Sequence, residues 1–341
     1  MRTAPPLARY KRELNEYLRA AVSHRHPPLL YQMIRYHLGW EDEHGRPDDA
    51  GGKALRASLC MLTCEVVGGD SRRALPAAAA VELVHNFSLI HDDIQDRDSE
   101  RHHRPTVWSI WGEAQAINAG DAILALARRV LLGLADEGVP APGVNEAARI
   151  LDERTLEMVE GQTLDLAFEG TLDVTVADCM GMVQRKSGAL FDCAFSLGAL
   201  AAGAEPQAIA QLGQVGRTLG TAFQVRDDML GIWGDPSITG KPRGADIRRR
   251  KKSLPIVYTL DQAEGPMRDQ LRQAYGEAEL SEQVVTLVLQ CLDDTGARQY
   301  CLNVAQERKD AALSALDQIK LQPGPAAELR ETAEFLLDRD Y

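Results

Sequence analysis

Residues 75–98 read LPAAAAVELVHNFSLIHDDIQDRD, and this stretch decides the fold. It is apolar on nearly every side until it reaches Asp92, and a helix of that kind is buried in a core. Alanine and leucine favour helix over strand. We therefore expect one long buried helix whose last turn carries carboxylates out of the core. Such an end is unfavourable unless something cationic lies there.

A second stretch, residues 207–228, repeats this design. Its apolar positions recur at helical spacing: Leu212, Val215, Leu219 and Phe223. The run then ends in Asp227 and Asp228, 135 residues after Asp92 (227 minus 92). Two acid-tipped apolar helices that face each other would form the type of metal site that helix bundles support.

The rest of the chain also has amphipathic helical patterns, separated by short glycine or proline breakers. No alternating pattern predicts a sheet, and no repeat is visible. The simplest interpretation is a single all-α domain over residues 1–341. The net charge of -12 argues against a nucleic-acid surface. Charged residues break every apolar run before the roughly 20 residues that a membrane span needs.

The six cysteines form no CxxC pair and mostly fall in apolar helical stretches. Buried reduced thiols are therefore the expectation, and disulfides or zinc ligands are the alternative. The N-terminal segment MRTAPPLARYKRELNEYL lacks the apolar core of a signal peptide. Together these features predict a soluble cytoplasmic protein.

The first acidic cluster is His91-Asp92-Asp93-Ile94-Gln95-Asp96. Asp92 and Asp96 are four residues apart and share a helix face, about 6 Å apart along the axis. Magnesium commonly takes one or two carboxylates together with substrate phosphate oxygens. An acidic helix end in solvent, or an N-cap for the next helix, is the other interpretation of a lone DDxxD.

A diphosphate held against carboxylates needs cations as well as metal. The sequence offers them in groups that punctuate the same region: Lys53 and Arg56, Arg101 to Arg104, Arg185 and Lys186, Lys241, and Arg248 to Lys252. Arginine suits phosphate oxygens bidentately and lysine acts as a point charge. Taken singly, each group could equally be a solvated surface charge.

Six segments, in this order, resemble the trans-polyprenyl diphosphate synthase family: GGKALR (51–56), HNFSLIHDDIQDRDSERHHRPT (85–106), GQTLDL, RKSGAL, GTAFQVRDD and GKPRGADIRRRKKSLP (240–255). The resemblance implies an isoprenoid synthase (class I terpenoid synthase) fold, an all-α bundle around a deep central cavity. It also implies a homodimer and about three Mg²⁺ ions, held by carboxylates and phosphate oxygens.

By that resemblance, Asp92 and Asp96 bind two of the ions, with Asp93 nearby. Asp227 binds the third, supported by Asp228, Asp246 and the pair Gln162 and Asp165. The implied substrate contacts fall into two groups. Allylic diphosphate would be held by Arg101, Lys186, Lys241 and Lys251, with Ser187 and Gln224 from the same motifs. Isopentenyl diphosphate would be held by Lys53, Arg56 and His85, with His102 where the family usually has an arginine.

The implied catalytic set is Asp92, Asp93, Asp96, Asp227, Asp228, Lys186 and Lys241. Two departures from the family pattern bear on it. Imidazole at His102 can be neutral near pH 7, which weakens a phosphate contact. The second motif reads DDMLG, with Gly231 where an aspartate is frequent, and we interpret it as a variant of the motif.

Product length is indicated by the residues that precede Asp92, since these line the floor where the growing tail descends. Phe87 stands five residues before Asp92, and Ser88 follows it. In the family a large residue there stops elongation, and this combination resembles synthases that make geranylgeranyl diphosphate, with farnesyl diphosphate as the other possibility. Alternatively, Phe87 is simply a core residue.

The expected activity is condensation of isopentenyl diphosphate with an allylic diphosphate through Mg-assisted ionisation. One alternative is a class I terpene synthase on the same fold, which acts on the allylic diphosphate alone and is favoured by His102. Another is a non-catalytic partner subunit. Lys53, Arg56 and His85 argue against the former, and the intact acidic and lysine positions argue against the latter.

Overall fold

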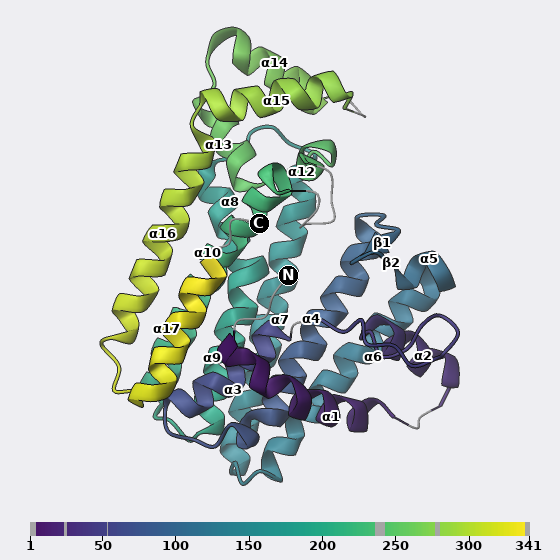
Figure 1. Cartoon of the computed structure of the whole chain (residues 1–341), viewed down its shortest axis with the longest axis vertical. Coiled ribbons are helices and arrows are strands. Elements are labelled where there is room, and N and C mark those ends of the chain that lie inside the picture. Colours follow the sequence, from purple (N-terminus) through teal and green to yellow (C-terminus); the bar gives the residue numbers. More distant parts are fainter. Residues whose placement is uncertain (1–4, 24–25, 53, 236–242, 277–279, 338–341) are drawn as a thin grey trace.

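The computed structural model describes residues 5–23, 26–52, 54–235, 243–276 and 280–337. Lys53 and Lys241 were both predicted to bind substrate, and both lie outside these described residues. Within the described part, nearly all regular structure is helical (Figure 1). The prediction of an all-α fold is confirmed.

The N-terminal half contains seven α-helices in the described residues: α1 (Lys11–Val22), α2 (Pro28–His37), α3 (Leu55–Val66), α4 (Leu75–Gln95), α5 (Val107–Trp111), α6 (Glu113–Leu131) and α7 (Ala141–Glu169). Three 3-10 turns join them: η1 (Pro5–Tyr10), η2 (Ser71–Ala74) and η3 (Leu132–Ala135). A hairpin of two very short strands, β1 (Glu100–Arg101) and β2 (Arg104–Pro105), follows α4.

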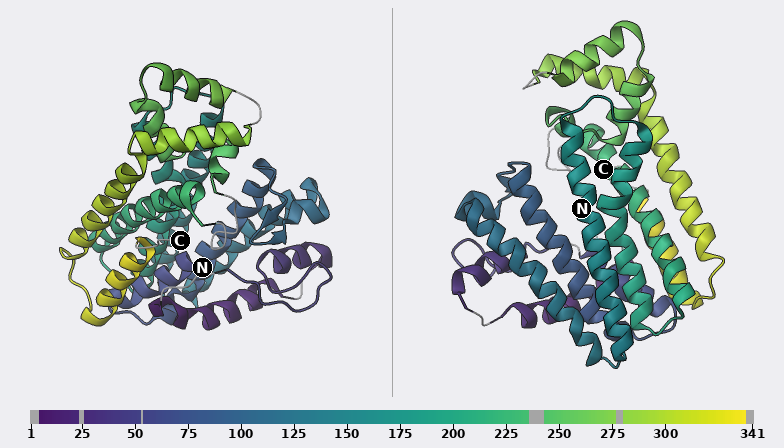
Figure 2. Two further views of the ribbon diagram at one scale, coloured as in Figure 1. Left: turned by 45° about the horizontal axis from the view of Figure 1, so that its top comes forward. Right: turned by 180° about the vertical axis from the view of Figure 1, so that it is seen from behind.

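The C-terminal half begins with α8 (Val176–Val183), which runs through a π-helical turn, η4 (Gln184–Gly188), into α9 (Ala189–Ala201). The remaining helices are α10 (Pro206–Trp233), α12 (Ala245–Arg248), α13 (Leu254–Gln262), α14 (Gly265–Gly276), α15 (Glu282–Asp294), α16 (Ala297–Leu316) and α17 (Pro323–Leu337). Helices α14 and α15 cap the upper end of the long helices (Figure 1; Figure 2, right).

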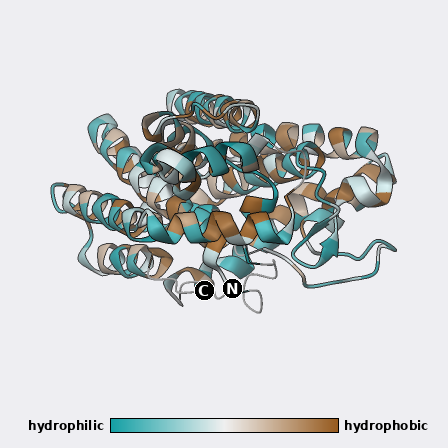
Figure 3. Cartoon of the chain, turned by 90° about the horizontal axis from the view of Figure 1, so that it is seen from above, coloured by the Kyte–Doolittle hydropathy of each residue, from teal (hydrophilic) through white to brown (hydrophobic). Residues whose placement is uncertain are grey.

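Helix α4 lies in the core, as its sequence predicts. Ala77 to Ala80 are completely buried, and the helix packs against α3, α6 and α9. Every residue of α9 is buried as well. Small side chains let helix axes approach closely, so these alanine-rich segments form the dense centre of the bundle. Banding of hydrophobic and hydrophilic residues along the other helices marks the faces that cover this centre (Figure 3).

Helix α10 is fixed by charge as well as by apolar packing. The Arg217 guanidinium donates to Glu157 Oε2 of α7 at 2.8 Å and to Asp192 Oδ2 of α9 at 2.9 Å. Asp192 is only 4% exposed, so its charge would be costly without these donors. The network sets the position of α10 against α7 and α9, and thus the place at which its acidic end emerges.

The upper end of the molecule has an apolar cluster of its own. Ile232 at the end of α10 packs in it with Ile247 of α12 and with residues of α13 to α15. A third cluster joins α8, α10, α13 and α16 around Val225 and Met229. The single-domain organisation over residues 1–341 stays a prediction.

All six cysteines are buried and free, as predicted. Burial raises the pKa of the thiols of Cys60 and Cys179 well above the usual range. None of the helices in the described residues has the length and apolar character needed to cross a membrane.

Candidate active site

The first aspartate motif occupies the end of α4. Asp92 lies on the last turn and Asp96 is the C-cap residue. Burial raises the pKa of Asp92, and the neighbouring charge of Asp96 raises it further, against the opposing effect of Lys186. The C-terminus of a helix is also the negative end of its dipole. Two carboxylates at this position therefore create a strong local demand for cations.

Asp93 points another way, because consecutive residues on a helix are about 100° apart. Its side chain is 2% exposed, and its Oδ1 accepts from Arg101 Nε at 2.7 Å. Burial raises the pKa of Asp93 to about 6 even with Arg101 alongside. The predicted role of Asp93 as a metal-binding residue stays a prediction. In this structure its partner is Arg101.

The β1–β2 hairpin carries Arg101 and His102. His102 and His103 form its turn, with φ of 51° and 61°, the left-handed conformation that a two-residue type I′ turn requires at both positions. Arg104 then donates to the backbone oxygens of Tyr36 at 3.2 Å and Glu41 at 2.9 Å. Sequence reasoning gave Arg104 no role. The structure shows that it anchors the hairpin that carries Arg101.

The second motif lies in the last two turns of α10. Asp228 is half-buried, with Gln224 Nε2 donating to it at 2.9 Å and the Leu254 N–H at 3.4 Å. The Ser187 hydroxyl in turn donates to Gln224 Oε1 at 2.5 Å. Burial raises the pKa of Asp228 to about 7, with contributions from Asp246 and Asp227. Ser187 and Gln224, predicted as substrate-binding residues, thus form a chain that supports Asp228.

Two lysines stand between these acidic ends. Lys186 Nζ is 2.5 Å from Asp165 Oδ2, and Lys251 Nζ is 3.6 Å from Asp96 Oδ2. Burial lowers the pKa of both ammonium groups, but neighbouring carboxylates outweigh it, chiefly Asp165 and Asp92 for Lys186 and Asp96 and Asp246 for Lys251, so the pKa of each is raised. Both lysines therefore stay charged near pH 7.

Lys186 owes its place to a local irregularity. It lies in the π-helical turn η4, a distortion that is frequent at functional sites. A Cβ on Gly161 of α7 would lie 2.3 Å from the Lys186 backbone nitrogen, so only glycine allows this approach. The GQTLDL and RKSGAL motifs are thereby brought into contact. Gln162, in the same motif, reaches α4 by donating to Gln95 Oε1 at 2.8 Å.

The basic run at 248–252 does not form one patch. Arg248 pairs with Glu282 of α15, and Arg249 donates to Asp98 Oδ2 at 2.9 Å, just beyond the first motif. Lys251 faces Asp96, whereas Lys252 is buried over the Tyr275 ring, 4.6 Å from its centroid. The sequence named Lys251 and missed the Arg249–Asp98 pair. This pair could not be predicted because 151 residues separate Arg249 from Asp98 in the sequence.

A third group of charges lies beneath the motifs. Arg56 Nη1 is 3.2 Å from His85 Nε2, and its guanidinium lies 5.0 Å from the Phe191 ring centroid. Burial lowers the pKa of Arg56 to about 10 and that of His85 well below its usual value. A guanidinium only donates, so neutral His85 must accept through Nε2. Buried Glu82, whose pKa burial raises, supplies the charge that supports Arg56.

Phe87 and Ser88 lie one turn or more before the acids. Ser88 is four residues before Asp92 and so shares its face, and its hydroxyl donates to the His85 carbonyl at 2.7 Å. Phe87 is 7% exposed and packs edge-on against His91, with ring centroids 4.8 Å apart. His91 faces α6, since its Nε2 lies 3.7 Å from Asp121 Oδ1. The small residue, Ser88, therefore lies below Asp92, and the large residue, Phe87, lies on the side of α4 that faces α6.

The donor set suits a hard divalent cation. Desolvation raises the pKa of both Asp92 and Asp228, so a cation placed beside them would favour their charged forms. Among the described residues, no three carboxylate, imidazole or thiol groups converge closely enough to hold a metal by themselves. Magnesium fits this arrangement, because it keeps waters and usually completes its shell with substrate phosphate oxygens.

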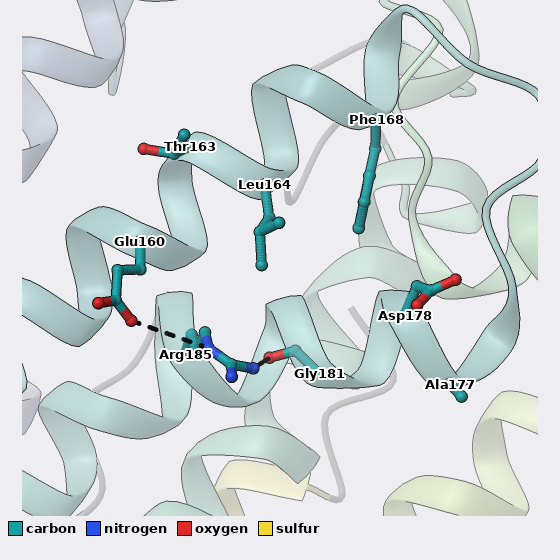
Figure 4. A pocket seen from close by; sticks show the side chains of 8 residues that line it. All are labelled: Glu160, Thr163, Leu164, Phe168, Ala177, Asp178, Gly181 and Arg185. Carbon is teal, nitrogen blue, oxygen red and sulfur yellow. Dashed lines mark hydrogen bonds and ion pairs between the residues drawn. The ribbon is translucent and has the colours of Figure 1, made fainter.

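A separate groove of about 630 Å³ lies between α7 and α8. Figure 4 shows Leu164 and Phe168 pointing into it from α7, with Arg185 opposite, 3.9 Å from Glu160. Of the basic residues that the sequence offered as candidate cations, Arg185 lines this groove, and none of the residues that the resemblance assigns to substrate or metal does.

Comparison with known proteins gives a consistent result. Residues 47–292 match the family model described as polyprenyl synthetase. The (2E,6E)-farnesyl diphosphate synthase of Mycobacterium tuberculosis is 40% identical, covering 99% of this chain and 94% of that protein. The geranylgeranyl diphosphate synthase of the same organism is 39% identical, covering 93% and 89%. A solved structure of a polyprenyl synthetase from Streptomyces coelicolor superposes with a TM-score of 0.91 at 38% identity, covering 98% and 99%.

Proposed function

This chain belongs to the polyprenyl synthetase family, and from that premise we propose how its residues divide the work of the reaction. It is a polyprenyl diphosphate synthase, a short-chain trans-prenyltransferase. The observation that carries the proposal is that Lys186 and Lys251 lie within electrostatic range of Asp92 and Asp96 in the first motif and of Asp246 beside the second. His85, which contacts Arg56, lies two turns before Asp92 on α4.

The allylic diphosphate binds at the acidic ends. Lys186, Lys251 and Arg101 supply fixed positive charge where the leaving diphosphate gains negative charge, which is electrostatic stabilisation of a transition state. The allylic carbon–oxygen bond breaks and diphosphate departs with the electron pair. The double bond of isopentenyl diphosphate then forms the new carbon–carbon bond, and a proton leaves, taken up by the departing diphosphate. The apolar walls of α4 and α9 exclude water that would quench the cation.

Magnesium is the metal of this family. When bound, it supplies Lewis-acid stabilisation of the leaving diphosphate. We assign Asp92 and Asp96 to one side of its site and Asp227, with Asp228 and Asp246, to the other. About three ions fit a donor set that relies on water and phosphate for the rest of each shell.

Isopentenyl diphosphate is assigned to the pair Arg56 and His85. Neutral His85 fixes one guanidinium arm by accepting from Arg56 Nη1, and Glu82 balances the buried charge. A terpene synthase that uses only an allylic diphosphate has no need of this second basic site. His102 sits in a turn that demands left-handed backbone, where histidine is tolerated better than most residues. Its presence is thus explained by the turn and does not argue for loss of the acceptor.

For the product we propose geranylgeranyl diphosphate. Small Ser88 lies on the face below Asp92, which leaves room for a tail longer than three isoprene units, while Phe87 narrows the side toward α6. Farnesyl diphosphate is the alternative, and the two relatives named above divide between these products.

For the assembly we propose a homodimer in the cytoplasm. Three large apolar side chains are exposed on α6 and α7: Ile117 (45%), Leu156 (61%) and Val159 (41%). Leu156 and Val159 are three residues apart and share one face of α7, and exposed apolar groups that gather on one face mark association surfaces. We expect Leu156→Glu to shift the sedimentation of the protein from dimer to monomer. Leu29→Glu, which changes an equally apolar exposed residue on α2, is the control and should leave the dimer intact.

One assay tests the reaction. The purified chain is incubated with magnesium and geranyl or farnesyl diphosphate, with and without isopentenyl diphosphate, and the products are separated by chain length. Longer diphosphates that form only with isopentenyl diphosphate support the proposal, and extension of farnesyl diphosphate supports the proposed product. Hydrocarbons or alcohols formed without isopentenyl diphosphate would instead make the chain a terpene synthase. Binding without turnover would make it a partner subunit.

A further inference from the structure

Two ion pairs join the segment after α4 to the segment after α12. Arg249 Nη1 donates to Asp98 Oδ2 at 2.9 Å, and Arg249 Nη2 donates to Asp98 Oδ1, so the guanidinium holds the carboxylate with both arms. Lys251 Nζ lies 3.6 Å from Asp96 Oδ2. On each segment the two paired residues are two positions apart. The segments are therefore joined at two neighbouring points.

The two ion pairs differ in what the proposed function asks of them. Asp96 is assigned to magnesium and Lys251 to the allylic diphosphate, so these side chains turn from each other to their ligands when the site is filled. Asp98 and Arg249 are assigned to neither ligand. Their ion pair can therefore stay closed throughout the reaction and keep the two segments at the same spacing.

Asp98 is held firmly on its own side of this contact. Its N–H donates to the Asp93 carbonyl at 2.9 Å. Its carbonyl accepts from Thr106 Oγ1 at 2.8 Å and from Trp108 Nε1 at 2.7 Å. The Asp98 side chain is only 12% exposed, so its charge depends on a close cationic partner. Asp98 thus presents its carboxylate from the fixed base of the β1–β2 hairpin.

Arg249 is fixed on the other side by the turn that ends α12. It is the C-cap residue of that helix. Arg250 follows with a left-handed φ of 54°, and its N–H donates to the Ile247 carbonyl at 2.8 Å. The Lys251 N–H then donates to the Asp246 carbonyl at 3.0 Å. Because these bonds close a short turn, the position of Arg249 sets the position of Lys251.

The rest of the run 248–252 ties this turn to the cap of the molecule. Arg248 pairs with Glu282 of α15, and Lys252 lies over the Tyr275 ring of α14. Figure 1 shows α12 beneath this cap and the hairpin above α4. The run therefore reaches from the cap to the first motif, and the ion pair of Arg249 with Asp98 is its bond to the hairpin.

We propose that Asp98 and Arg249 are positioning residues for the allylic diphosphate, because their ion pair holds Lys251 at a fixed distance from the first aspartate motif. Arg249 acts through Lys251, two residues further on, and Asp98 acts through Arg249. Neither residue touches the reacting atoms. This inference deepens the proposed function and rests on it.

Two measurements test this role. Steady-state kinetics give KM for the allylic diphosphate and for isopentenyl diphosphate, and calorimetry gives the magnesium-dependent binding of inorganic diphosphate. We expect Asp98→Asn and Arg249→Gln each to raise KM for the allylic diphosphate, and Kd for inorganic diphosphate, roughly 5- to 10-fold, since a bidentate pair contributes more than an ordinary surface pair. KM for isopentenyl diphosphate should stay unchanged, because the ion pair does not reach Arg56 and His85.

The exchanged double variant, Asp98→Arg with Arg249→Asp, restores an ion pair of reversed polarity. It should return KM for the allylic diphosphate to within about threefold of wild type. The double variant Asp98→Asn with Arg249→Gln should lose no more than either single change, because both remove the same interaction.

Arg272→Gln is the matched control. It breaks an ion pair of 3.1 Å with Asp173, which also joins two distant segments but lies at neither motif. This change should leave both KM values and the binding of diphosphate intact. Thermal unfolding checks that each variant is folded. If the Arg249 variants fail to fold, Asp98→Asn carries the test, since it keeps the shape of the side chain and all three backbone hydrogen bonds of Asp98.

The outcomes separate this inference from the proposed function. Unchanged KM for the allylic diphosphate in Asp98→Asn, or an exchanged variant no better than the single changes, would overturn the inference while the wild type still transfers prenyl groups. An equal rise in both KM values would overturn it as well, since it indicates a general structural loss. A rise confined to Arg249→Gln would make Arg249 a direct ligand of the diphosphate and also overturn it. A wild-type protein that neither binds diphosphate with magnesium nor transfers a prenyl group would remove both proposals.

Discussion

The acidic ends of α4 and α10 differ in how their carboxylates are supported. At α4, Asp92 and Asp96 come from one helix and their balancing cations come from elsewhere, from Lys186 and Lys251. At α10, Asp228 is held by a chain of neutral donors that begins at Ser187, and a second helix contributes Asp246. The first motif supplies its own carboxylates, and other elements add only positive charge. The second motif has fewer carboxylates on its own helix, and other elements add hydrogen-bond donors and a further carboxylate.

The largest expected effect lies at α4. Asp92→Asn keeps the shape of the side chain but removes a charge that the helix end holds in place for cations. We expect kcat for prenyl transfer to fall on the order of 10³-fold, the scale of losing a principal group that stabilises developing charge. Steady-state kinetics at saturating magnesium measure it.

Asp310→Asn, which changes an exposed carboxylate on α16, is the control for this comparison and should have no effect. A fall of less than about tenfold for Asp92→Asn would show that the first motif is not the principal metal side.

A smaller loss is expected at α10. Asp228 acts through its hydrogen bonds with Gln224 and Leu254. Asp228→Asn should raise the magnesium concentration needed for half-maximal rate roughly 10- to 100-fold, with a weaker effect on kcat at saturating metal. A magnesium titration of the rate distinguishes the two. Equal losses of kcat for Asp92→Asn and Asp228→Asn would contradict the expectation that the motif of α4 contributes more to the rate than the motif of α10.

Within the first motif, Asp93 should matter less than Asp92, because its carboxylate faces Arg101. Asp93→Asn should raise KM for the allylic diphosphate about tenfold, since a charge-assisted hydrogen bond contributes about 1.5–3 kcal/mol. If Asp93 acts through Arg101, adding Asp93→Asn to Arg101→Gln should cost nothing further. If the two changes instead have additive effects on KM, Asp93 acts independently of Arg101, which would support its predicted role as a metal-binding residue.

The smallest effect on rate is expected beneath the first motif. Phe87→Ala should leave turnover nearly unchanged and lengthen the product, because the ring beside His91 no longer narrows the side of the tail site toward α6. The cavity should also lower stability by about 3 kcal/mol. Chromatography of the products tests this, with Phe87→Leu as the milder change. Products of unchanged length would leave Phe87 a core residue.

Most of the fold could be predicted from local pattern. The alanine-rich run of α4 and the spacing of Leu212, Val215 and Leu219 in α10 predict buried helices, because helix propensity and apolar periodicity act within one segment. The predicted acidic end is confirmed for α4, whereas α10 runs five residues past Asp228 to Trp233, so its two aspartates lie inside the helix. The hairpin after α4 was missed, because two residues per strand leave no alternating pattern to detect.

The site was less predictable where it depends on residues distant in sequence. Arg249 and Asp98 are 151 residues apart and still form an ion pair. Within the run 248–252, only packing separates Lys251, which faces Asp96, from Lys252, which is buried over Tyr275. Charge alone cannot indicate which basic side chain turns inward, because that depends on what lies opposite.

The sequence by itself determined the helical fold, the two buried helices that carry the acidic motifs and, through the ordered motifs, the family. These depend on interactions within a segment, which a local pattern records. Only the tertiary structure decided that Asp93 turns to Arg101, that His102 serves a tight turn, and that the space above Gly231 is occupied by Asp246. Each depends on where a second element places its atoms, and the packing of the whole chain sets that place.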